Sequence, residues 1–436
     1  MKNAMNEMLL KYVAGLMAVN VCAMALAGCS TDSASGADST GTSAVSAVST
    51  LTETNEADTS DTNTNDTAVV TTNLNTSISG GQYSADDLFT DRDLAQTADL
   101  SDATYYTVKD GQDITVTKAG VYVLSGTASD VTVTVNAGSD DKVQLVLDGV
   151  SITNADFPCI YVKQADKVFV TTTNTDNSLS VTGSFTADGD TNTDGAIFSK
   201  DDLVLNGVGT LTVSSTDNGV VCKDDLKVTG GTYVVTASSK AFEANDSIRI
   251  ADGTFTLKAG TDGLHAENEE DGTLGYVYIA GGSFEIQAGD DGIHATSVVQ
   301  IDGGSFNISA AEGVEGTYVQ INGGTVNISS WDDGINAARK SSSYTPTVEI
   351  TGGDITVTMS SGDTDGVDSN GNIIITGGTV NVTGQSSFDY DGTATFTGGT
   401  VIVNGQQVDT LPNQMMGGGF GGQGQMGGYG GGRGRR

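Results

Sequence analysis

Cysteine, basic residues and helical periodicity are all scarce in this sequence. Only Cys159 and Cys222 lie beyond the N-terminal region, and two cysteines make no disulfide framework. Lysine and arginine total 19 against 55 aspartates and glutamates, which gives a formal net charge of −36. Such a charge keeps an exported protein soluble, argues against a nucleic-acid partner and attracts metal cations. No stretch shows the 3.6-residue apolar period of an amphipathic helix, so the body of the chain is not expected to be α-helical.

The first 28 residues predict a lipoprotein signal peptide. A basic start precedes an apolar run over residues 12–27, which is too short to span a membrane and ends in the letters LAGC at Cys29. Small residues let a peptidase approach, and the Cys29 thiol accepts the lipid. We therefore predict an exported lipoprotein, anchored to the membrane at the cell surface through Cys29. The alternative is an ordinary secretory signal followed by an incidental cysteine.

Composition divides the rest of the chain into three parts. Residues 29–100 are rich in Ser, Thr and Asp with few large apolar side chains, which predicts a disordered tether. Residues 411–436 are mostly Gly, Met, Gln and Arg, which predicts a disordered tail. The folded domain is expected over residues 101–410.

Two short motifs recur through this domain. Pairs of glycines precede alternating runs such as TFTL and SFNI, a pattern typical of strands that follow turns. Out of phase with them, an acidic residue precedes Gly, an apolar residue, a polar residue and a small residue, as in DGIHA at 291–295. From Gly219 onward this motif recurs every 21 or 22 residues, apart from two longer steps of 29 and 32. We predict an all-β domain, a single-stranded right-handed parallel β-helix of about ten coils, behaving as a monomer.

Equivalent positions in stacked coils form ladders roughly 4.8 Å apart per step. The residue after the motif glycine is always apolar, which predicts an interior ladder. Its members are Ile160, Ile197, Val220, Phe242, Leu264, Ile293, Val314, Ile335, Val367 and Phe388. The next residue should face outward. That outward ladder contains Glu243, His265, His294, Glu315, Asn336, Asp368 and Asp389. His265 and His294 are interpreted as stacked surface imidazoles, with a transition-metal pair as the alternative.

An acidic residue stands directly before the motif glycine in five coils. Stacked carboxylates repel one another, and Ca²⁺, which accepts several carboxylate oxygens, relieves that repulsion. The alternative is a set of solvated turn caps with raised pKa values. The predicted calcium ligands, with flanking aspartates, are Asp262, Asp290, Asp291, Glu312, Asp332, Asp333, Asp365 and Asp368.

The two long steps place insertions at residues 267–275 and 338–345, three coils apart and thus roughly 14 Å along the axis. Insertions on one flank of a solenoid commonly shape its binding face. Trp331, the single tryptophan, lies in the coil of the second insertion and either stacks on a sugar ring or packs beneath its own loop. An aromatic ring and cations beside carboxylates suit an acidic polysaccharide. The predicted sugar-binding residues are His265, His294, Glu315, Trp331, Asn336, Arg339, Lys340 and Tyr344.

Several motifs together resemble those of bacterial carbohydrate-binding-domain-containing surface lipoproteins with a pectate-lyase-like β-helix. They are DDKVQLVLDGV at 140–150, CIYVK at 159–163, SKDDL at 199–203, CKDDL at 222–226, WDDGINAA at 331–338 and FDYDG at 388–392. The resemblance spans roughly residues 104–405 and departs from the expected pattern at Cys159 and Cys222. It implies a calcium-bearing β-helix that binds acidic sugars such as polygalacturonate, and also cellulose, without catalysis.

Three functions follow from these observations. The first is calcium-assisted polysaccharide binding without catalysis. The second is a polysaccharide lyase, which needs calcium and a basic side chain to remove a proton beside the uronate carboxylate. Lys240 is the best candidate for that base, although pairing with a carboxylate is the simpler interpretation. The third is a structural surface protein, against which the two aligned insertions argue.

Overall fold

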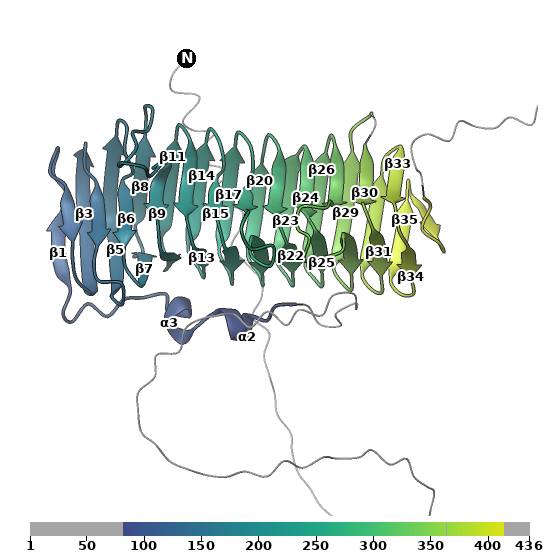
Figure 1. Cartoon of the computed structure of the whole chain (residues 1–436), viewed down its shortest axis with the longest axis horizontal. Helices are drawn as coiled ribbons and strands as arrows, with labels where there is room; N and C mark the ends of the chain where they lie inside the picture. Colours follow the sequence, from purple (N-terminus) through teal and green to yellow (C-terminus); the bar gives the residue numbers. More distant parts are fainter. Residues whose placement is uncertain (1–81, 363, 414–436) are drawn as a thin grey trace, which may run out of the picture. The chain divides into compact units, whose positions relative to one another are not determined.

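The computed structural model describes residues 82–362 and 364–413. The predicted signal peptide, Cys29 and residues 30–81 of the predicted tether lie outside the described residues, as does the tail from residue 414. Within the described part, the chain winds through successive coils, and most coils contribute one strand to each of three faces (Figure 1). All pairings between coils are parallel; only β36 at the C-terminal end pairs antiparallel. The prediction of a parallel β-helix is confirmed.

Face 1 is a separate parallel sheet of 12 strands. Its strands are β2 (Ile114–Val116), β4 (Val133–Asn136), β6 (Ile160–Gln164), β9 (Gly195–Ser199), β12 (Asn218–Cys222), β15 (Phe242–Ala244), β18 (Leu264–Ala266), β21 (Asp291–Ala295), β24 (Glu312–Gly316), β27 (Asp333–Ala337), β30 (Asp365–Ser369) and β33 (Ser386–Tyr390).

Faces 2 and 3 are joined into one sheet by two long strands, β3 (Gly120–Ser129) and β5 (Lys142–Asn154), because the first half of β5 pairs with β7 and its second half with β8. The other strands of face 2 are β1 (Thr104–Thr107), β7 (Lys167–Thr172), β10 (Asp202–Gly207), β13 (Asp225–Val228), β16 (Ser247–Ile250), β19 (Tyr276–Ile279), β22 (Val298–Ile301), β25 (Tyr318–Ile321), β28 (Thr347–Ile350), β31 (Asn372–Ile375) and β34 (Ala394–Phe396). Those of face 3 are β8 (Asp176–Val181), β11 (Thr210–Ser215), β14 (Thr232–Ala237), β17 (Thr254–Ala259), β20 (Ser283–Gln287), β23 (Ser305–Ala310), β26 (Thr325–Ser330), β29 (Asp354–Met359), β32 (Thr379–Thr383), β35 (Thr400–Val403) and β36 (Gln406–Val408).

The core consists of ladders that run along the inside of the coils. The ten apolar residues predicted from Ile160 to Phe388 are register partners on consecutive face 1 strands, and all are fully buried. Two further strands, β2 and β4, extend this ladder beyond the predicted ten coils. On face 3, the parallel rings of Phe255, Phe284 and Phe306 stack with centroids 4.5 Å apart. Side-chain alternation within each strand therefore fills the interior as predicted.

The acidic-Gly motif, interpreted from the sequence as a turn signal, lies within strands in four coils. Asp291 and Gly292 are part of β21, and the equivalent pairs open β24, β27 and β30. The glycines are needed for space, since a Cβ on Gly334 would lie 2.3 Å from Val357 Cγ1 and 2.4 Å from the Gly366 carbonyl oxygen. In these four coils the acidic residue therefore stands on a strand, which fixes its position in the site.

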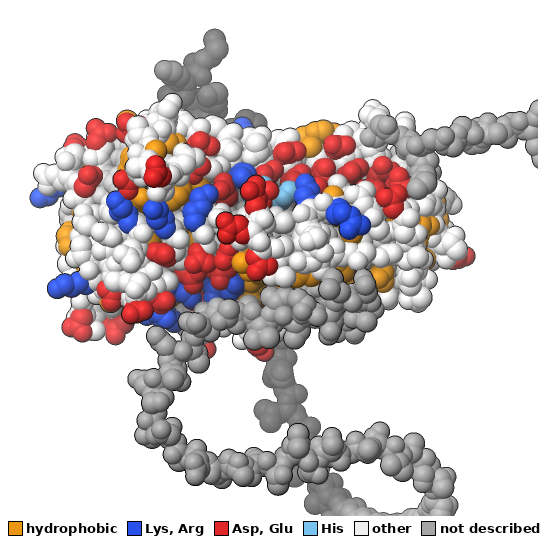
Figure 2. Space-filling view, in the orientation of Figure 1, with side chains coloured by type: hydrophobic (Ala, Val, Ile, Leu, Met, Phe, Trp, Pro, Cys, Tyr) orange, Lys and Arg blue, Asp and Glu red, His pale blue; other side chains and the backbone are white. Residues whose placement is uncertain are grey.

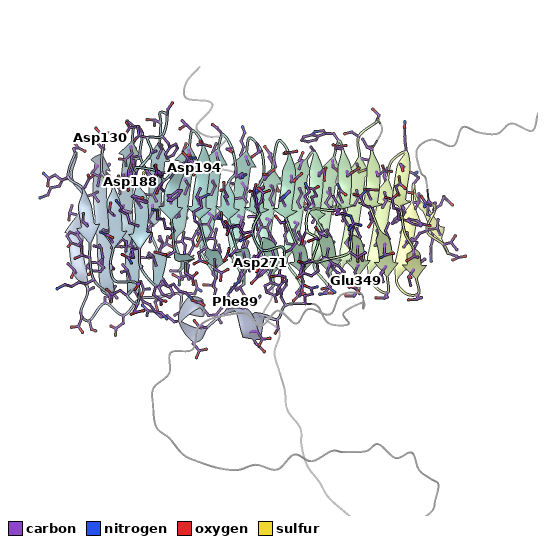
Figure 3. All side chains as sticks on the ribbon, in the orientation of Figure 1. Phe89, Asp130, Asp188, Asp194, Asp271 and Glu349 are labelled. Atoms are coloured by element: carbon purple, nitrogen blue, oxygen red, sulfur yellow. The ribbon has the colours of Figure 1, made fainter. Side chains whose placement is uncertain are left out.

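Residues 82–100, predicted as the end of the disordered tether, instead pack along face 2. This segment, here called the strap, contains α2 (Ala85–Leu88) and α3 (Asp91–Leu94) and runs beneath the coils, where Figure 3 labels its Phe89. The Tyr83 ring stacks on Tyr276 at 4.3 Å, and the buried Asp93 carboxylate lies 3.1 Å from the buried Lys227 ammonium. No helix among the described residues is both long enough and apolar enough to cross a membrane.

We expect Asp93→Ala to release the strap while the coils stay folded. Burial raises the pKa of Asp93, but the Lys227 and Lys167 ammoniums outweigh burial, so the net shift is downward. The carboxylate therefore stabilises the docked strap at every pH above the ordinary value of 3.8 and loses this effect as the pH falls through the lowered pKa. Loss of a buried charge partner should cost at least ~1.4 kcal/mol, a tenfold rise in the open form.

Limited proteolysis at pH 7 measures this opening. Cleavage within residues 82–100 should be about tenfold faster in Asp93→Ala than in the wild type. Asp91→Ala is the matched control, because Asp91 lies in the same helix with its side chain exposed. Equal cleavage rates in the two variants would show that the Asp93 ion pair does not hold the strap.

Candidate functional site

The outward ladder of face 1 is continuous. Glu243, His265, His294, Glu315, Asn336, Asp368 and Asp389 are register partners on consecutive strands from β15 to β33. Four of them are less accessible than the sequence predicts, with exposures of 7% for His265 and His294, 5% for Glu315 and 8% for Asn336. Neighbouring polar side chains cover them, so this is a dense charged surface and not a row of free side chains.

The earlier coils of the same ladder are apolar. There Tyr161, Phe198 and Val221 are buried in a small cluster with Phe157, and the Tyr161 hydroxyl donates to Asp188. The charged part of the outward ladder therefore begins at Glu243 on β15. In Figure 2, acidic side chains gather along this face, with basic side chains beside them.

Two histidine–aspartate pairs lie at β18 and β21, with Asp262 just before β18 and Asp291 at the start of β21. His265 Nδ1 lies 2.8 Å from Asp262 Oδ2, and His294 Nδ1 lies 2.7 Å from Asp291 Oδ2. The two imidazole rings stack with centroids 4.5 Å apart, as the sequence predicted. Burial lowers the pKa of His294, but the Asp291 and Glu315 carboxylates outweigh burial and raise it to about 9. Asp262 and Asp291 are therefore paired with imidazoles, unlike the open calcium ligands predicted from the sequence.

The later coils hold a group of carboxylates, Glu312, Asp333, Asp365 and Asp368, that we call the carboxylate ladder. Burial and neighbouring carboxylates raise the pKa of Glu312 to about 8, of Asp333 to about 6 and of Asp368 to about 7. The Asp365 N–H donates to Asp333 Oδ1 at 3.1 Å. These four predicted metal ligands thus lie on three consecutive strands, β24, β27 and β30.

Asn336 lies within the carboxylate ladder and leaves an acceptor unused. Its Nδ2 donates to Glu312 Oε2 at 3.0 Å, whereas its buried Oδ1 has no hydrogen-bond partner among the described residues. An orphan carbonyl oxygen beside desolvated carboxylates fits the all-oxygen donor set that Ca²⁺ prefers. The other predicted ligands, Asp290 and Asp332, are exposed on turns outside this group.

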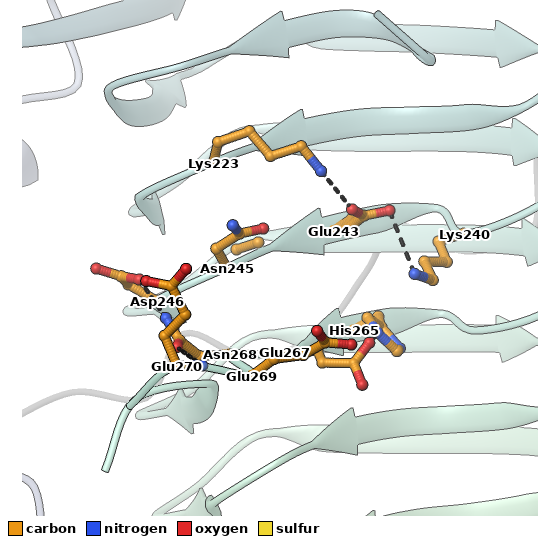
Figure 4. Close-up of a pocket in the computed structure, with 11 residues that line it drawn as sticks. Lys223, Lys240, Glu243, Asn245, Asp246, His265, Glu267, Asn268, Glu269 and Glu270 are labelled. Atoms are coloured by element: carbon orange, nitrogen blue, oxygen red, sulfur yellow. Dashed lines mark hydrogen bonds and ion pairs between the residues drawn. The ribbon is translucent and has the colours of Figure 1, made fainter. Parts of the chain in front are cut away.

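A hollow of about 460 Å³ lies at the earlier end of the charged region (Figure 4). On one side, Glu243 accepts from Lys223 Nζ at 2.8 Å and lies 3.3 Å from Lys240 Nζ. On the other side stand Asp246 and Asn268, which hydrogen-bond each other at 2.8 Å. The residues lining the hollow are Lys223, Lys240, Glu243, Ala244, Asn245, Asp246, His265, Glu267, Asn268, Glu269 and Glu270.

Lys223 was not predicted as a site residue. It follows the small corner residue of its coil, in the same position as Lys200, Asn245 and Glu267 in neighbouring coils. A comparison of that position across coils would have revealed a row of polar groups leading into the first insertion. Lys240, the candidate base of a lyase, lies 3.3 Å from Glu243 Oε2 and is therefore paired with a carboxylate.

The two insertions meet, although three coils separate their origins. Ser341 Oγ donates to the Gly272 carbonyl at 2.6 Å, because the second insertion folds back over Thr317, whose hydroxyl accepts from the Lys340 and Ser341 N–H groups. Together they form one wall beside face 1. Lys340 leaves this wall and lies 2.7 Å from Glu315 Oε2.

The remaining predicted sugar-binding residues divide between two places. Trp331 is 48% exposed at the turn between β26 and β27, so it does not pack beneath its own loop. Arg339 is also exposed. Tyr344 instead packs against the strap in a cluster with Tyr83, away from the outward ladder of face 1.

A second acidic cluster lies at the corner between faces 1 and 2. Asp202, Asp224 and Asp225 bring their oxygens within 4.8 Å of one another. Asp225 pairs with Arg249 at 2.6 Å and Asp202 with Lys167 at 3.4 Å. These ion pairs join the corner to charged residues of face 2, along which the strap packs.

Comparison with known proteins places this geometry in context. A family model described as carbohydrate-binding domain-containing protein matches residues 110–363 and 312–410. A carbohydrate-binding domain-containing protein of Acetivibrio thermocellus is 38% identical over 130 residues, which cover 29% of this chain and 46% of that protein. The aligned part therefore spans less than half of the relative's length.

Among solved structures, a polysaccharide lyase-like protein from C. thermocellum, determined as a gadolinium derivative, matches with a TM-score of 0.43. It is 32% identical, and the match covers 50% of this chain and 92% of that one.

Proposed function

Because the chain belongs to the family of carbohydrate-binding domain-containing proteins, we propose that face 1 binds an acidic polysaccharide such as polygalacturonate, assisted by calcium and without cleaving it. Cellulose is a further ligand to test. The proposal rests on the carboxylate ladder, whose partly buried carboxylates lie on the same and neighbouring strands as Asn336, with its orphan oxygen, near the exposed Trp331.

The residues that would hold calcium are Glu312, Asp333, Asn336, Asp365 and Asp368. Bound calcium supplies positive charge that relieves the repulsion between these carboxylates and attracts the carboxylates of a uronate polymer. Without a cation, this part of face 1 repels a polyanion, since its own carboxylates are stacked on neighbouring strands. The proposal therefore requires sugar binding to depend on the metal.

The other side chains of face 1 have distinct roles in this account. The exposed Trp331 ring offers a flat apolar surface on which a sugar ring stacks, and Arg339 offers a cation for a carboxylate. Lys223 and Lys240 hold Glu243 between them at the edge of the hollow and leave donors for sugar hydroxyls. Binding along the coils would place successive sugars over successive strands.

The absence of cleavage is proposed from the contact that Lys240 makes with Glu243. Glu243 engages the Lys240 Nζ at 3.3 Å, whereas a lyase needs an unengaged basic side chain beside the calcium. The proposal also retains the cell-surface location and membrane attachment through Cys29 that the N-terminal sequence predicts. A monomer is expected.

Titration of pectate into the full chain, once with calcium and once with a chelator, tests the proposal. We expect retention with calcium only and no rise in the absorbance of unsaturated uronates. A growing absorbance would instead make the protein a lyase. No retention in either condition would contradict the proposed binding.

A further inference from the structure

Asp291, His294 and Glu315 direct three ligand atoms to one point on face 1. His294 and Glu315 are register partners on β21 and β24, and Asp291 begins β21. His294 Nδ1 lies 2.7 Å from Asp291 Oδ2 and 2.9 Å from Glu315 Oε2. All three ligand atoms lie within 4.8 Å of one another. Paired strands set the positions of all three side chains in advance.

One hydrogen on His294 Nδ1 cannot bond fully to both the Asp291 and the Glu315 carboxylates. A ring nitrogen carries at most one hydrogen, so the two carboxylate oxygens compete for the same donor. All three side chains are more than nine-tenths buried, with exposures of 5% for Asp291, 7% for His294 and 5% for Glu315, so water is a poor substitute. A cation at the point of convergence would satisfy all three ligands at once.

The distances suit a small dication after a modest adjustment. Ligands at about 2.0–2.1 Å from a tetrahedral Zn²⁺ lie roughly 3.3 Å from one another. The two distances from His294 Nδ1 are 2.7 and 2.9 Å, so each carboxylate needs to move outward by roughly half an ångström. Rotation of the Asp291 and Glu315 side chains supplies such a shift without moving the strands.

A lysine ammonium already contacts one of the three ligand atoms. Lys340, from the wall formed by the insertions, places its Nζ 2.7 Å from the very oxygen, Glu315 Oε2, that faces His294. Positive charge is therefore held on this oxygen from two directions. A metal ion would displace the Lys340 ammonium from it, because two cations at one oxygen repel each other.

We propose that Asp291, His294 and Glu315 form a binding site for one divalent transition-metal ion of the Zn²⁺ type. One imidazole and two carboxylates suit such an ion, whereas Ca²⁺ takes six to eight oxygen ligands at longer distances. The inference does not depend on sugar binding, and the site is distinct from the all-oxygen carboxylate ladder. Three protein ligands leave a fourth position for water or a sugar hydroxyl.

The neighbouring pair of His265 and Asp262 provides an internal control. His265 has Asp262 at its Nδ1, at 2.8 Å, but its second carboxylate, Glu267, contacts the opposite nitrogen, Nε2, at 3.2 Å. Its two acidic partners therefore do not converge on one point. Since the chain has only two histidines, substitution of each in turn tests every imidazole.

The test is competition between the untagged full chain and a chromophoric chelator for Zn²⁺, in an excess of Ca²⁺. The wild type and His265→Gln should bind one equivalent tightly, and His294→Gln should bind at least about 100-fold more weakly. Glu315→Gln, which keeps the size of the side chain, should weaken binding as well. Circular dichroism shows that each variant is folded.

Co²⁺ then identifies the ligands by absorption. Visible bands without a sulfur-to-metal charge-transfer band, lost in His294→Gln, support the site. The inference is overturned if the wild type takes up no Zn²⁺, if His294→Gln binds as the wild type does, or if His265→Gln loses binding equally. Thiolate bands in the wild type would also overturn it.

Discussion

Gly334→Ala should strongly destabilise the protein. The added Cβ would lie 2.3 Å from Val357 Cγ1 and 2.4 Å from the Gly366 carbonyl oxygen. Neither can yield easily, because valine is stiff at χ1 and the carbonyl belongs to the neighbouring strand. Overpacking of this kind costs about 3 kcal/mol or more, which corresponds to a fall in Tm of at least about 6 °C.

Thermal unfolding followed by circular dichroism measures the effect. Gly281→Ala is the matched control, since its Cβ would meet only the Ala251 carbonyl oxygen at 3.2 Å. A Tm for Gly334→Ala within about 2 °C of the control value would mean that the coils stack less tightly here than described.

The double substitution Asp333→Asn with Asp368→Asn should abolish calcium-dependent retention of pectate. It removes two of the four charges of the carboxylate ladder while keeping side-chain volume, so calcium affinity should fall at least about tenfold. The same change should raise the Tm by a few degrees in chelator at pH 8. Both folded-state pKa values, about 6 and about 7, lie above the ordinary 3.8, so ionisation of these groups destabilises the fold as the pH rises through that range.

The double variant should thus lose calcium-dependent retention but gain thermal stability. General damage to the fold would instead lower both. Asp176→Asn with Asp354→Asn makes the same change of charge at exposed positions on face 3 and should alter neither property. Undiminished calcium-dependent retention in the Asp333 and Asp368 variant would show that the ladder is not the metal site.

The features that repeat from coil to coil could be predicted from the sequence. One interior residue per coil, such as Ile293 or Val367, recurs at a nearly constant step, and stacking follows from that step alone. The outward positions of His265 and His294 followed from strand alternation, and their rings do stack.

Contacts between distant segments could not be predicted in the same way. Asp93 lies in a polar, irregular stretch, and only the folded chain brings it to Lys227, 134 residues away. The two insertions start at equivalent places in their coils, but their own sequences do not repeat, so their contact through Ser341 and Gly272 had no signal in the sequence. Tyr344 was assigned to the sugar-binding face because its loop was expected to stand beside Trp331, whereas the loop folds back toward the strap.

The acidic residues before the motif glycines were predicted as one set of ligands. The structure divides them into two groups, which the sequence did not predict. Acidic spacing treats Asp262, Asp291 and Asp333 alike, and only the placement of the two imidazoles shows that the first two contact a histidine. Desolvation and local partners, which decide the charge of each group, depend on side-chain conformations that spacing does not specify.

Trp331 offers the most direct test of sugar binding at face 1, because it is the single tryptophan of the chain and stands 48% exposed next to Asp332 and Asp333. Its fluorescence should change on addition of oligogalacturonate in calcium, saturate with sugar concentration and return to the starting value with chelator. Unchanged fluorescence in calcium, under conditions where the protein is retained by pectate, would contradict the account and place the sugar on another face.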